Sequence, residues 1–235
     1  MPLRLITLDL DYTLWDATPA LIAAENAMHQ WIAAHSPATA SFYPPEKMRE
    51  YKNWVAASYP ELRGKVSELR FETLRRVFMQ SGHDRDHARE LAKGAFNAFF
   101  NARSQGLELY EDVDAALNTL KQSCPLIAIS NGNADLTIAG HQHYFSDHLN
   151  ADKHGAAKPA PDMFLEALKR TGVEAHEALH IGDHPEQDIA AAASAGFRTI
   201  WFDQNNSGWE MTDVRPDAIF THWRQLVPLI HSLVD

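Results

Sequence analysis

Cysteine is almost absent from this sequence, and no apolar run is long enough to span a membrane. Cys124 is the one cysteine among 235 residues, which excludes an internal disulfide and suits a reducing compartment. A membrane-spanning helix needs about 20 consecutive apolar residues. The N-terminal stretch carries a single Arg and reaches an acid at Asp9, unlike a secretory signal. We therefore expect a cytoplasmic protein without a membrane partner.

Positive charge is also scarce. The chain carries 21 Lys and Arg against 31 Asp and Glu, a formal net charge of −10. Nucleic acids and anionic membranes are bound through clustered Lys and Arg, so we expect neither as a partner. A small anionic substrate is still compatible with this net charge if positive side chains gather locally at its site. The hydrophobic share of 45% is ample for a core, and the length fits one large domain or one domain with a smaller insertion.

The stretch LRLITLDLDYTLWD, residues 3–16, leads an almost unbroken apolar run into acidic residues. Such a run is typical of a parallel strand that is buried on both faces. Asp9 and Asp11 come at its end, and ligands bind at the carboxyl ends of strands in open parallel sheets. Two neighbouring carboxylates repel each other unless a cation or a proton separates them, so the stretch predicts Mg²⁺. The alternative is a polar strand end followed by a turn.

Residues 17–107 have the periodicity of helices rather than of strands. In the first helical segment Leu21, Ala24, Met28 and Trp31 recur at helical spacing, and three further segments follow. The alternation of strands and helices resumes near Leu109. We therefore expect a four-helix unit inserted into an α/β core made of residues 1–16 and 108–235.

A second expected strand, residues 125–130, also ends in polar residues. It runs into Ser130, Asn131 and Gly132, where a hydroxyl group and a tight glycine turn can bind a phosphate. By itself, such a segment would be an ordinary turn. A helix carrying Leu136 and Ile138 is expected to follow.

Further charged residues occur later in the chain. Residues 178–182 form an expected strand that ends at Asp183, and Asp188 follows five positions later. Acids at this spacing can face the same crevice as Asp9, and oxygen ligands are what Mg²⁺ prefers. Lys158 precedes a proline and is the best candidate for the cation that several carboxylates and a phosphate would require.

These four segments, in this order, resemble the four motifs of the haloacid dehalogenase (HAD) superfamily of phosphohydrolases. The D-x-D-x-T pattern of motif I, from Asp9 to Thr13, is followed by S-N-G-N, K-P-x-P-x-x-F and the H-I-G-D stretch. The resemblance implies a Rossmann-like, doubly wound parallel sheet with an inserted all-helical cap of the C1 type.

The resemblance also implies roles for individual residues. Asp9 would be the nucleophile that becomes an aspartyl phosphate, Asp11 the acid and base, and Lys158 the catalytic cation. The residues implied in binding the phosphate or substrate are Thr13, Ser130 and Asn131, and those implied in binding Mg²⁺ are Asp9, Asp11, Asp183 and Asp188. Related members often carry a second acid where His184 stands, so Asp188 would be either a direct ligand or an outer partner.

The stretches ISNGN, KPAPDMF, HIGD and PELRGKVSELR are similar to the flavin-pathway members of this superfamily. Those enzymes dephosphorylate 5-amino-6-(5-phospho-D-ribitylamino)uracil and act on FMN. Such a substrate would need a polar donor beside a stacking surface, for which we expect Arg70 and Trp54 of the cap. The alternative is a surface arginine and a core tryptophan. The DLDYTLW form of motif I also resembles magnesium-dependent phosphatases of protein or sugar phosphates, which lack a large cap.

Several functions therefore remain open. The first is a Mg²⁺-dependent phosphatase for a small-molecule phosphomonoester, favoured by Asp11. The second is a 2-haloacid dehalogenase, which needs no Mg²⁺ and normally lacks an acid at the position of Asp11. A sugar-phosphate phosphatase or mutase is a variant of the first, and a non-catalytic binding protein is the third. The sequence decides neither the substrate nor between a monomer and a homodimer.

Overall fold

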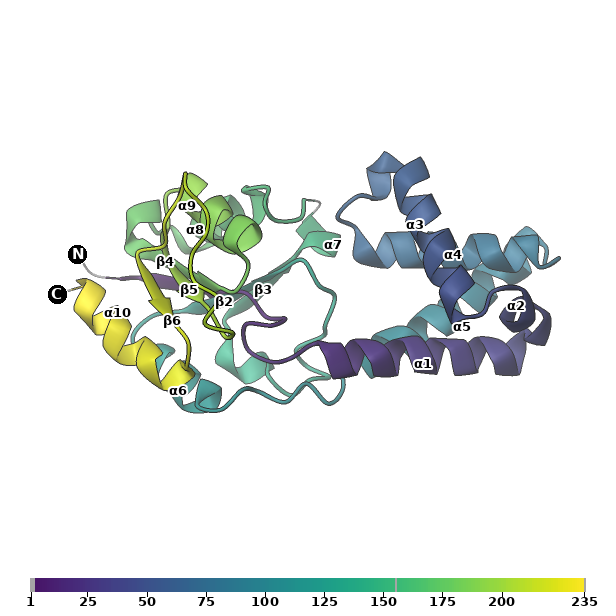
Figure 1. Ribbon diagram of the computed structural model, residues 1–235, viewed down its shortest axis with the longest axis horizontal. Coiled ribbons are helices and arrows are strands. Elements are labelled where there is room, and N and C mark those ends of the chain that lie inside the picture. The colour runs from purple at the N-terminus through teal and green to yellow at the C-terminus, as the bar shows by residue number, and fades with distance from the viewer. Residues whose placement is uncertain (1–2, 155, 235) are drawn as a thin grey trace. The chain divides into compact units, whose positions relative to one another are not determined.

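The expected strands form one six-stranded parallel sheet in the computed structural model, which describes residues 3–154 and 156–234 (Figure 1). The sheet has the order β3-β2-β1-β4-β5-β6, and its five pairings are all parallel. The strands are β1 (Leu5–Leu8), β2 (Leu126–Ser130), β3 (Asp147–Asn150), β4 (Ala178–Gly182), β5 (Arg198–Phe202) and β6 (Ala218–Phe220). This is the doubly wound order of dinucleotide-binding folds, and the predicted α/β fold class is confirmed.

Helices cover both faces of the sheet, which explains the continuous apolar runs of β1, β2 and β4 (Figure 1). One face carries α8 (Asp162–Thr171) and α9 (Ala191–Ser194), and the opposite face carries α6 (Val113–Leu120) and α10 (Leu226–Val234). On the α8 side, Leu5 and Ile129 of the sheet pack in one buried cluster with Phe164. The shorter elements are α7 (Ala151–His154), η2 (Gln142–Tyr144), η3 (Ala175–Glu177), η4 (Pro185–Ala190) and η5 (Trp223–Gln225).

The chain divides into two compact units. The sheet unit comprises residues 1–16, 108–132 and 140–235, and the helical unit comprises residues 17–107 and 133–139. The helices of the second unit are α1 (Thr18–His35), α2 (Pro37–Phe42), α3 (Pro45–Ser58), α4 (Val66–Gln80) and α5 (Arg85–Arg103), with the short turn η1 (Pro60–Leu62). The helices α1, α3, α4 and α5 correspond to the four expected helical segments, and the short α2 is an additional helix. That this unit acts as a cap stays a prediction.

A tight contact between two long helices organises the helical unit. A Cβ atom added at Gly94 of α5 would lie 2.1 Å from the Trp31 ring of α1, so only glycine permits this approach. Buried apolar side chains of α1, α4 and α5, among them Met28, Phe78 and Ala92, fill the space between the helices. Among the residues that the structure describes, no helix is long and apolar enough to cross a membrane.

The helix expected at Leu136 and Ile138 is wrong. Residues 136–140 form turns and residues 133–135 have no regular structure, and residues 133–139 belong to the helical unit rather than to the sheet unit. The Asp135 carboxylate accepts hydrogen bonds from the Thr137 and Ile138 amides, which starts one helical turn. Gly140 follows with a φ of 80°, a left-handed conformation that ends a helix. The segment is too short for its apolar residues to form a regular helix.

Candidate active site

Asp9 and Asp183 lie where the strand order of the sheet reverses. β1 and β4 are neighbours, although β2 and β3 lie on the other side of β1. Asp9 directly follows β1, and its amide extends the ladder by donating to the Ile181 carbonyl at 2.9 Å. Asp183 directly follows β4. The carboxyl ends of strands at such a switch point form the ligand crevice of open α/β sheets.

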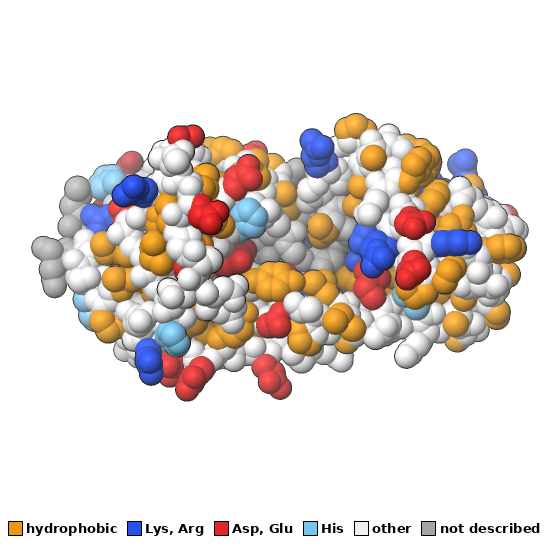
Figure 2. All heavy atoms as spheres, viewed as in Figure 1, with side chains coloured by type: hydrophobic (Ala, Val, Ile, Leu, Met, Phe, Trp, Pro, Cys, Tyr) orange, Lys and Arg blue, Asp and Glu red, His pale blue; other side chains and the backbone are white. Residues whose placement is uncertain are grey.

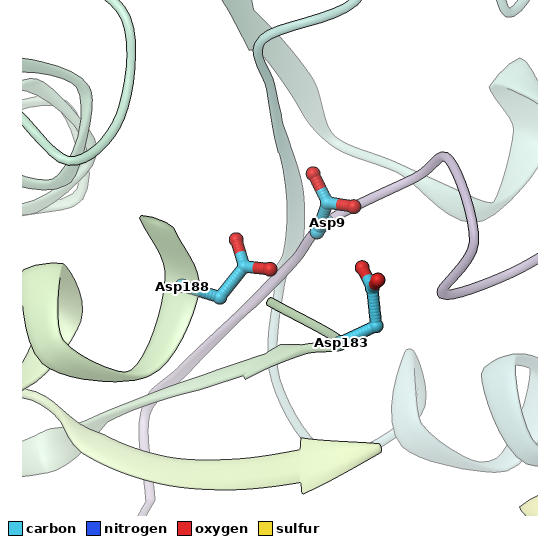
Figure 3. A group of neighbouring side chains, drawn as sticks. All are labelled: Asp9, Asp183 and Asp188. Carbon is cyan, nitrogen blue, oxygen red and sulfur yellow. The ribbon is translucent and has the colours of Figure 1, made fainter. Parts of the chain in front are cut away.

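Three carboxylates gather at this crevice and point toward one another (Figure 3). They belong to Asp9, Asp183 and Asp188, and one oxygen of each lies within 4.8 Å of the others. Asp188 comes from η4, one turn after β4. A Cβ atom at Gly182 would lie 2.3 Å from the Asp188 Cγ, so glycine at the end of β4 gives this carboxylate its place.

The Lys158 ammonium is buried among these acids. Its Nζ donates to Asp9 Oδ1 at 2.6 Å, to Asp188 Oδ1 at 2.5 Å and to the Ile129 carbonyl at 2.9 Å. An ammonium has three donors, so all of them are used. The Lys158 side chain is 1% exposed. Lys158 therefore places a positive charge next to Asp9, as the sequence analysis expected.

Asn131 fixes the backbone from which Lys158 projects. Its Oδ1 accepts from the Lys158 amide at 2.7 Å, and its Nδ2 donates to the Lys158 carbonyl and to Gln187 Oε1, both at 2.8 Å. Asn131 thus binds the backbone of Lys158, and its predicted role as a substrate or positioning contact stays a prediction. Ser130 lies at the end of β2, and its Oγ accepts from the Gly132 amide at 2.9 Å.

Thr13 and Asp11 lie on the turn after β1. The Thr13 hydroxyl is placed between two carboxylates, at 3.0 Å from Asp183 Oδ1 and 3.3 Å from Asp9 Oδ2. The Asp11 carboxylate accepts from the Trp15 indole at 2.8 Å, and it is not one of the three grouped carboxylates. The Thr13 hydroxyl therefore links Asp9 and Asp183, two of the three grouped acids.

The charges of this group are unbalanced. Burial raises the pKa of Asp9 well above its usual value; Lys158 opposes this shift, and Asp188 and Asp183 add to it. Burial, with Asp188 adding to it, raises the pKa of Asp183 to about 6. For Asp188, burial is outweighed by Lys158 and His180, which hold its pKa well below the usual range. One ammonium therefore compensates only part of the negative charge of three acids.

A divalent cation suits this donor set. Mg²⁺ prefers carboxylate oxygens and keeps several waters. A dication would offset the mutual repulsion of the acids, which adds to the effect of burial in raising the pKa values of Asp9 and Asp183. The side chains that could hold it are Asp9, Asp183 and Asp188.

His180, which the sequence reasoning did not single out, completes the acid group from inside β4. The imidazole is fully buried, with Nδ1 at 2.8 Å from the Thr7 hydroxyl and Nε2 at 3.3 Å from Asp188 Oδ1. Burial lowers the pKa of His180, so a neutral ring can accept from Thr7 and donate to Asp188. The signal was a histidine inside an otherwise apolar strand.

His184 has a structural role of its own. Its Nδ1 accepts from the Glu186 and Gln187 amides and so caps the start of η4, and its amide donates to Asp188 Oδ2 at 2.9 Å. The residue that replaces the usual second acid therefore helps to place Asp188.

Arg70 and Trp54 belong to the helical unit. The Arg70 guanidinium pairs with Glu25 at 2.9 Å and lies 3.5 Å above the Phe99 ring centroid. Trp54 is 51% exposed and stacks on Tyr51 at 5.3 Å. Arg70 is thus partly buried and ion-paired instead of being a free surface arginine, and Trp54 is not a core tryptophan.

A family model described as haloacid dehalogenase-like hydrolase matches residues 3–196. The chain belongs to the haloacid dehalogenase-like hydrolases. This match covers most of the chain, and phosphatases are found among its relatives, so the predicted HAD-like phosphatase is confirmed as a class.

Relatives of this haloacid dehalogenase-like hydrolase carry different names. The 5-amino-6-(5-phospho-D-ribitylamino)uracil phosphatase YigB of Escherichia coli (strain K12) is 30% identical over 201 residues, 86% of this chain and 84% of that protein. A phosphoserine phosphatase of Thermus thermophilus is 32% identical over 160 residues, 64% and 62% of the two chains. The crystal structure of a 2-haloacid dehalogenase from Pseudomonas syringae pv. Tomato DC3000 has a TM-score of 0.92 and 36% identity, covering 98% and 99%.

Proposed function

We propose that this chain is a Mg²⁺-dependent phosphatase that hydrolyses a small-molecule phosphomonoester through a phosphoryl group on Asp9. The observation that carries the proposal is the surroundings of Asp9. Its carboxylate lies at the switch point, 2.6 Å from the Lys158 ammonium, and it shares the crevice with Asp183 and Asp188.

The proposed reaction has two displacement steps. In the first, an Asp9 carboxylate oxygen bonds to phosphorus while the ester oxygen leaves with a proton from Asp11. In the second, water attacks the phosphorus and gives its proton to Asp11, and the bond between phosphorus and Asp9 breaks to release phosphate. A carboxylate nucleophile thus divides one difficult transfer into two easier ones, and a proton donor is needed mainly where the leaving oxygen is basic.

The neighbouring side chains would position these groups. Lys158 and a bound Mg²⁺ would offset the charge that approaches when a phosphate dianion meets Asp9. Ser130 accepts from the Gly132 amide at 2.9 Å, so its hydroxyl hydrogen can donate to a phosphoryl oxygen. The Trp15 indole holds the Asp11 carboxylate at 2.8 Å, which keeps this acid beside the strand end.

For the substrate, we infer the ribitylamino-uracil phosphate named for the Escherichia coli relative, or FMN. Arg70 and Trp54 remain the proposed residues of the helical unit that recognise it. Arg70→Ala should raise KM for FMN and leave p-nitrophenyl phosphate hydrolysis almost unchanged. The matched control is Arg75→Ala on the same helix, where Arg75 pairs with Glu72. Equal effects on the KM values of both substrates, or no effect on either, would show that Arg70 does not take part in substrate recognition.

A second candidate, 2-haloacid dehalogenase, is favoured by the likeness to the Pseudomonas syringae structure. The two activities place different demands on the site. A dehalogenase needs no metal, whereas three grouped carboxylates beside one ammonium suit a dication. Asp11 also stands two residues after Asp9, where dehalogenases of the superfamily normally lack an acid.

Parallel assays separate the candidates. We expect release of p-nitrophenol from p-nitrophenyl phosphate with Mg²⁺ and its loss after treatment with EDTA, with no chloride release from 2-chloropropionate. Metal-independent release of chloride, together with no hydrolysis of any phosphate ester, would overturn the phosphatase proposal. A panel containing the ribitylamino-uracil phosphate, FMN, phosphoserine and sugar phosphates would then identify the substrate.

A further inference from the structure

A pocket of about 220 Å³ lies within the helical unit, between α1, α3 and α4. Met28, Met48 and Leu74 give it an apolar wall. Arg49, Lys52 and Arg70 also line it, together with two acids, Glu25 and Glu46. On the face seen in Figure 2, basic and acidic side chains lie next to one another over this unit. Ligand sites generally combine an apolar lining with a few polar groups and have volumes of about 300–1,000 Å³. This pocket has such a lining and is smaller than that range, so it suits a small ligand.

The charge of Arg70 is already compensated. Its guanidinium pairs with Glu25 at 2.9 Å and lies over the Phe99 ring at 3.5 Å. The Arg70 side chain is 13% exposed. Arg70 and Glu25 therefore form one wall of the pocket as an ion pair without net charge.

Lys52 is different, because its ammonium has no carboxylate within 4.0 Å in the part of the chain that the structure describes. The side chain is half-buried, and burial, aided by Arg70 and Arg49, lowers the pKa of Lys52. Glu25 opposes this shift without forming an ion pair with Lys52. A partly desolvated ammonium without a partner is unfavourable, and an anion in the pocket would relieve it.

We propose that this pocket binds a small organic monoanion, whose carboxylate pairs with Lys52 and whose apolar part lies against Met28, Met48 and Leu74. A single negative charge is the match, because three basic side chains face two acidic ones around the pocket. A phosphate dianion would meet Glu25 and Glu46 with more repulsion. The proposal is independent of the catalytic chemistry at Asp9.

The probe is hexanoate, observed by NMR of protein with ¹³C-labelled methionine methyl groups. Met28 and Met48 line the pocket, while Met163 is buried in the core of the sheet unit and serves as an internal reference. We expect hexanoate to shift the Met28 and Met48 signals in a saturable way and to leave Met163 unchanged. Absence of a saturable shift, or an equal shift at Met163, would overturn the proposal.

Two comparisons test the charge. Hexan-1-ol has the same apolar chain without the carboxylate, and it should bind about tenfold more weakly, the worth of one charge-assisted hydrogen bond. Inorganic phosphate should produce weaker shifts than hexanoate at the same methionines. If hexan-1-ol or phosphate bound as tightly as hexanoate, the assignment to an organic monoanion would be wrong.

Matched variants test the residue. Lys52→Met should weaken hexanoate binding about tenfold, whereas Lys52→Arg, which keeps the charge, should retain it. Lys47→Met is the control, since Lys47 lies exposed on the same helix and outside the pocket. Loss of binding in the Lys47 variant equal to that in Lys52→Met would indicate a general charge effect and refute the site. Because Lys52→Arg should fold even where Lys52→Met does not, its failure to bind hexanoate would also count against the proposal.

Discussion

Lys158→Met should destabilise the sheet unit strongly in metal-free buffer. The substitution keeps most of the side-chain volume and removes only the ammonium. In the native protein this ammonium lies 2.6 Å from Asp9 and 2.5 Å from Asp188, with 1% of the side chain exposed. Its loss would leave both carboxylates, and that of Asp183, without the cation that compensates them.

The size of the effect follows from burial. Removing one partner of a buried ion pair costs about 3–5 kcal/mol, because a charge remains in a poorly solvated place. For a chain of this size, each kcal/mol lowers Tm by about 2–4 °C, so the expected loss is about 6–20 °C. The matched control is Lys169→Met, because Lys169 is 81% exposed and pairs loosely with Glu166 at 3.7 Å. The control should change Tm very little.

The pH dependence of this loss has a definite sign. Lys158 lowers the pKa values of Asp9 and Asp188, so without it these buried carboxylates hold protons more tightly in the folded state than in the unfolded chain. A folded state that binds more protons loses stability as pH rises. The Tm deficit of Lys158→Met should therefore be larger at pH 8 than at pH 5.

Thermal melts of EDTA-treated protein, followed by circular dichroism, measure both quantities. If Lys158→Met lowered Tm at pH 8 by less than about 2 °C, the loss of stability would be below about one kcal/mol. That result would refute the argument that Lys158 compensates the charge of the acid group. A deficit that shrinks as pH rises would refute the sign.

Three further predictions concern single side chains. Asp9→Asn should reduce p-nitrophenyl phosphate turnover to background. The melting curve should stay near that of the wild type, because the Lys158 ammonium keeps its pair with Asp188. Near-normal turnover would exclude Asp9 as the nucleophile. Asp11→Asn should slow the hydrolysis of alkyl phosphates about 10²–10⁴-fold and that of p-nitrophenyl phosphate much less, and burst kinetics would show which step limits the rate. An equal loss for both substrates in the step that breaks the ester bond would contradict the role of Asp11 as a general acid. Cys124 is 8% exposed, and burial raises the pKa of its thiol to about 11, so a thiol reagent at pH 7.5 should modify the unfolded chain rapidly and the native protein hardly at all, and fast labelling of the native form would disprove this.

Local sequence patterns predicted much of the fold. The apolar runs that end at Leu8, Ser130 and Gly182 are strands in the structure, because a strand covered on both faces needs apolar residues at every position. Helical spacing likewise predicted α1, α3, α4 and α5. It failed at Leu136 and Ile138, where Asp135 starts only a single turn before Gly140.

For the candidate site, the sequence by itself determined which residues stand at strand ends, and the resemblance to a known family supplied the roles expected of them. Only the tertiary structure decided how they meet. Asn131 binds the backbone of Lys158, 27 positions away, and His180 turns its ring to Asp188. The physical reason is that a strand-end motif fixes where a side chain leaves the sheet, whereas its partners depend on which strands become neighbours. Parallel pairing of β1 with β4 places Leu5 opposite Ala178, 173 positions later in the chain, and brings Asp9 and Asp183 together. No local sequence pattern contains a pairing over that separation.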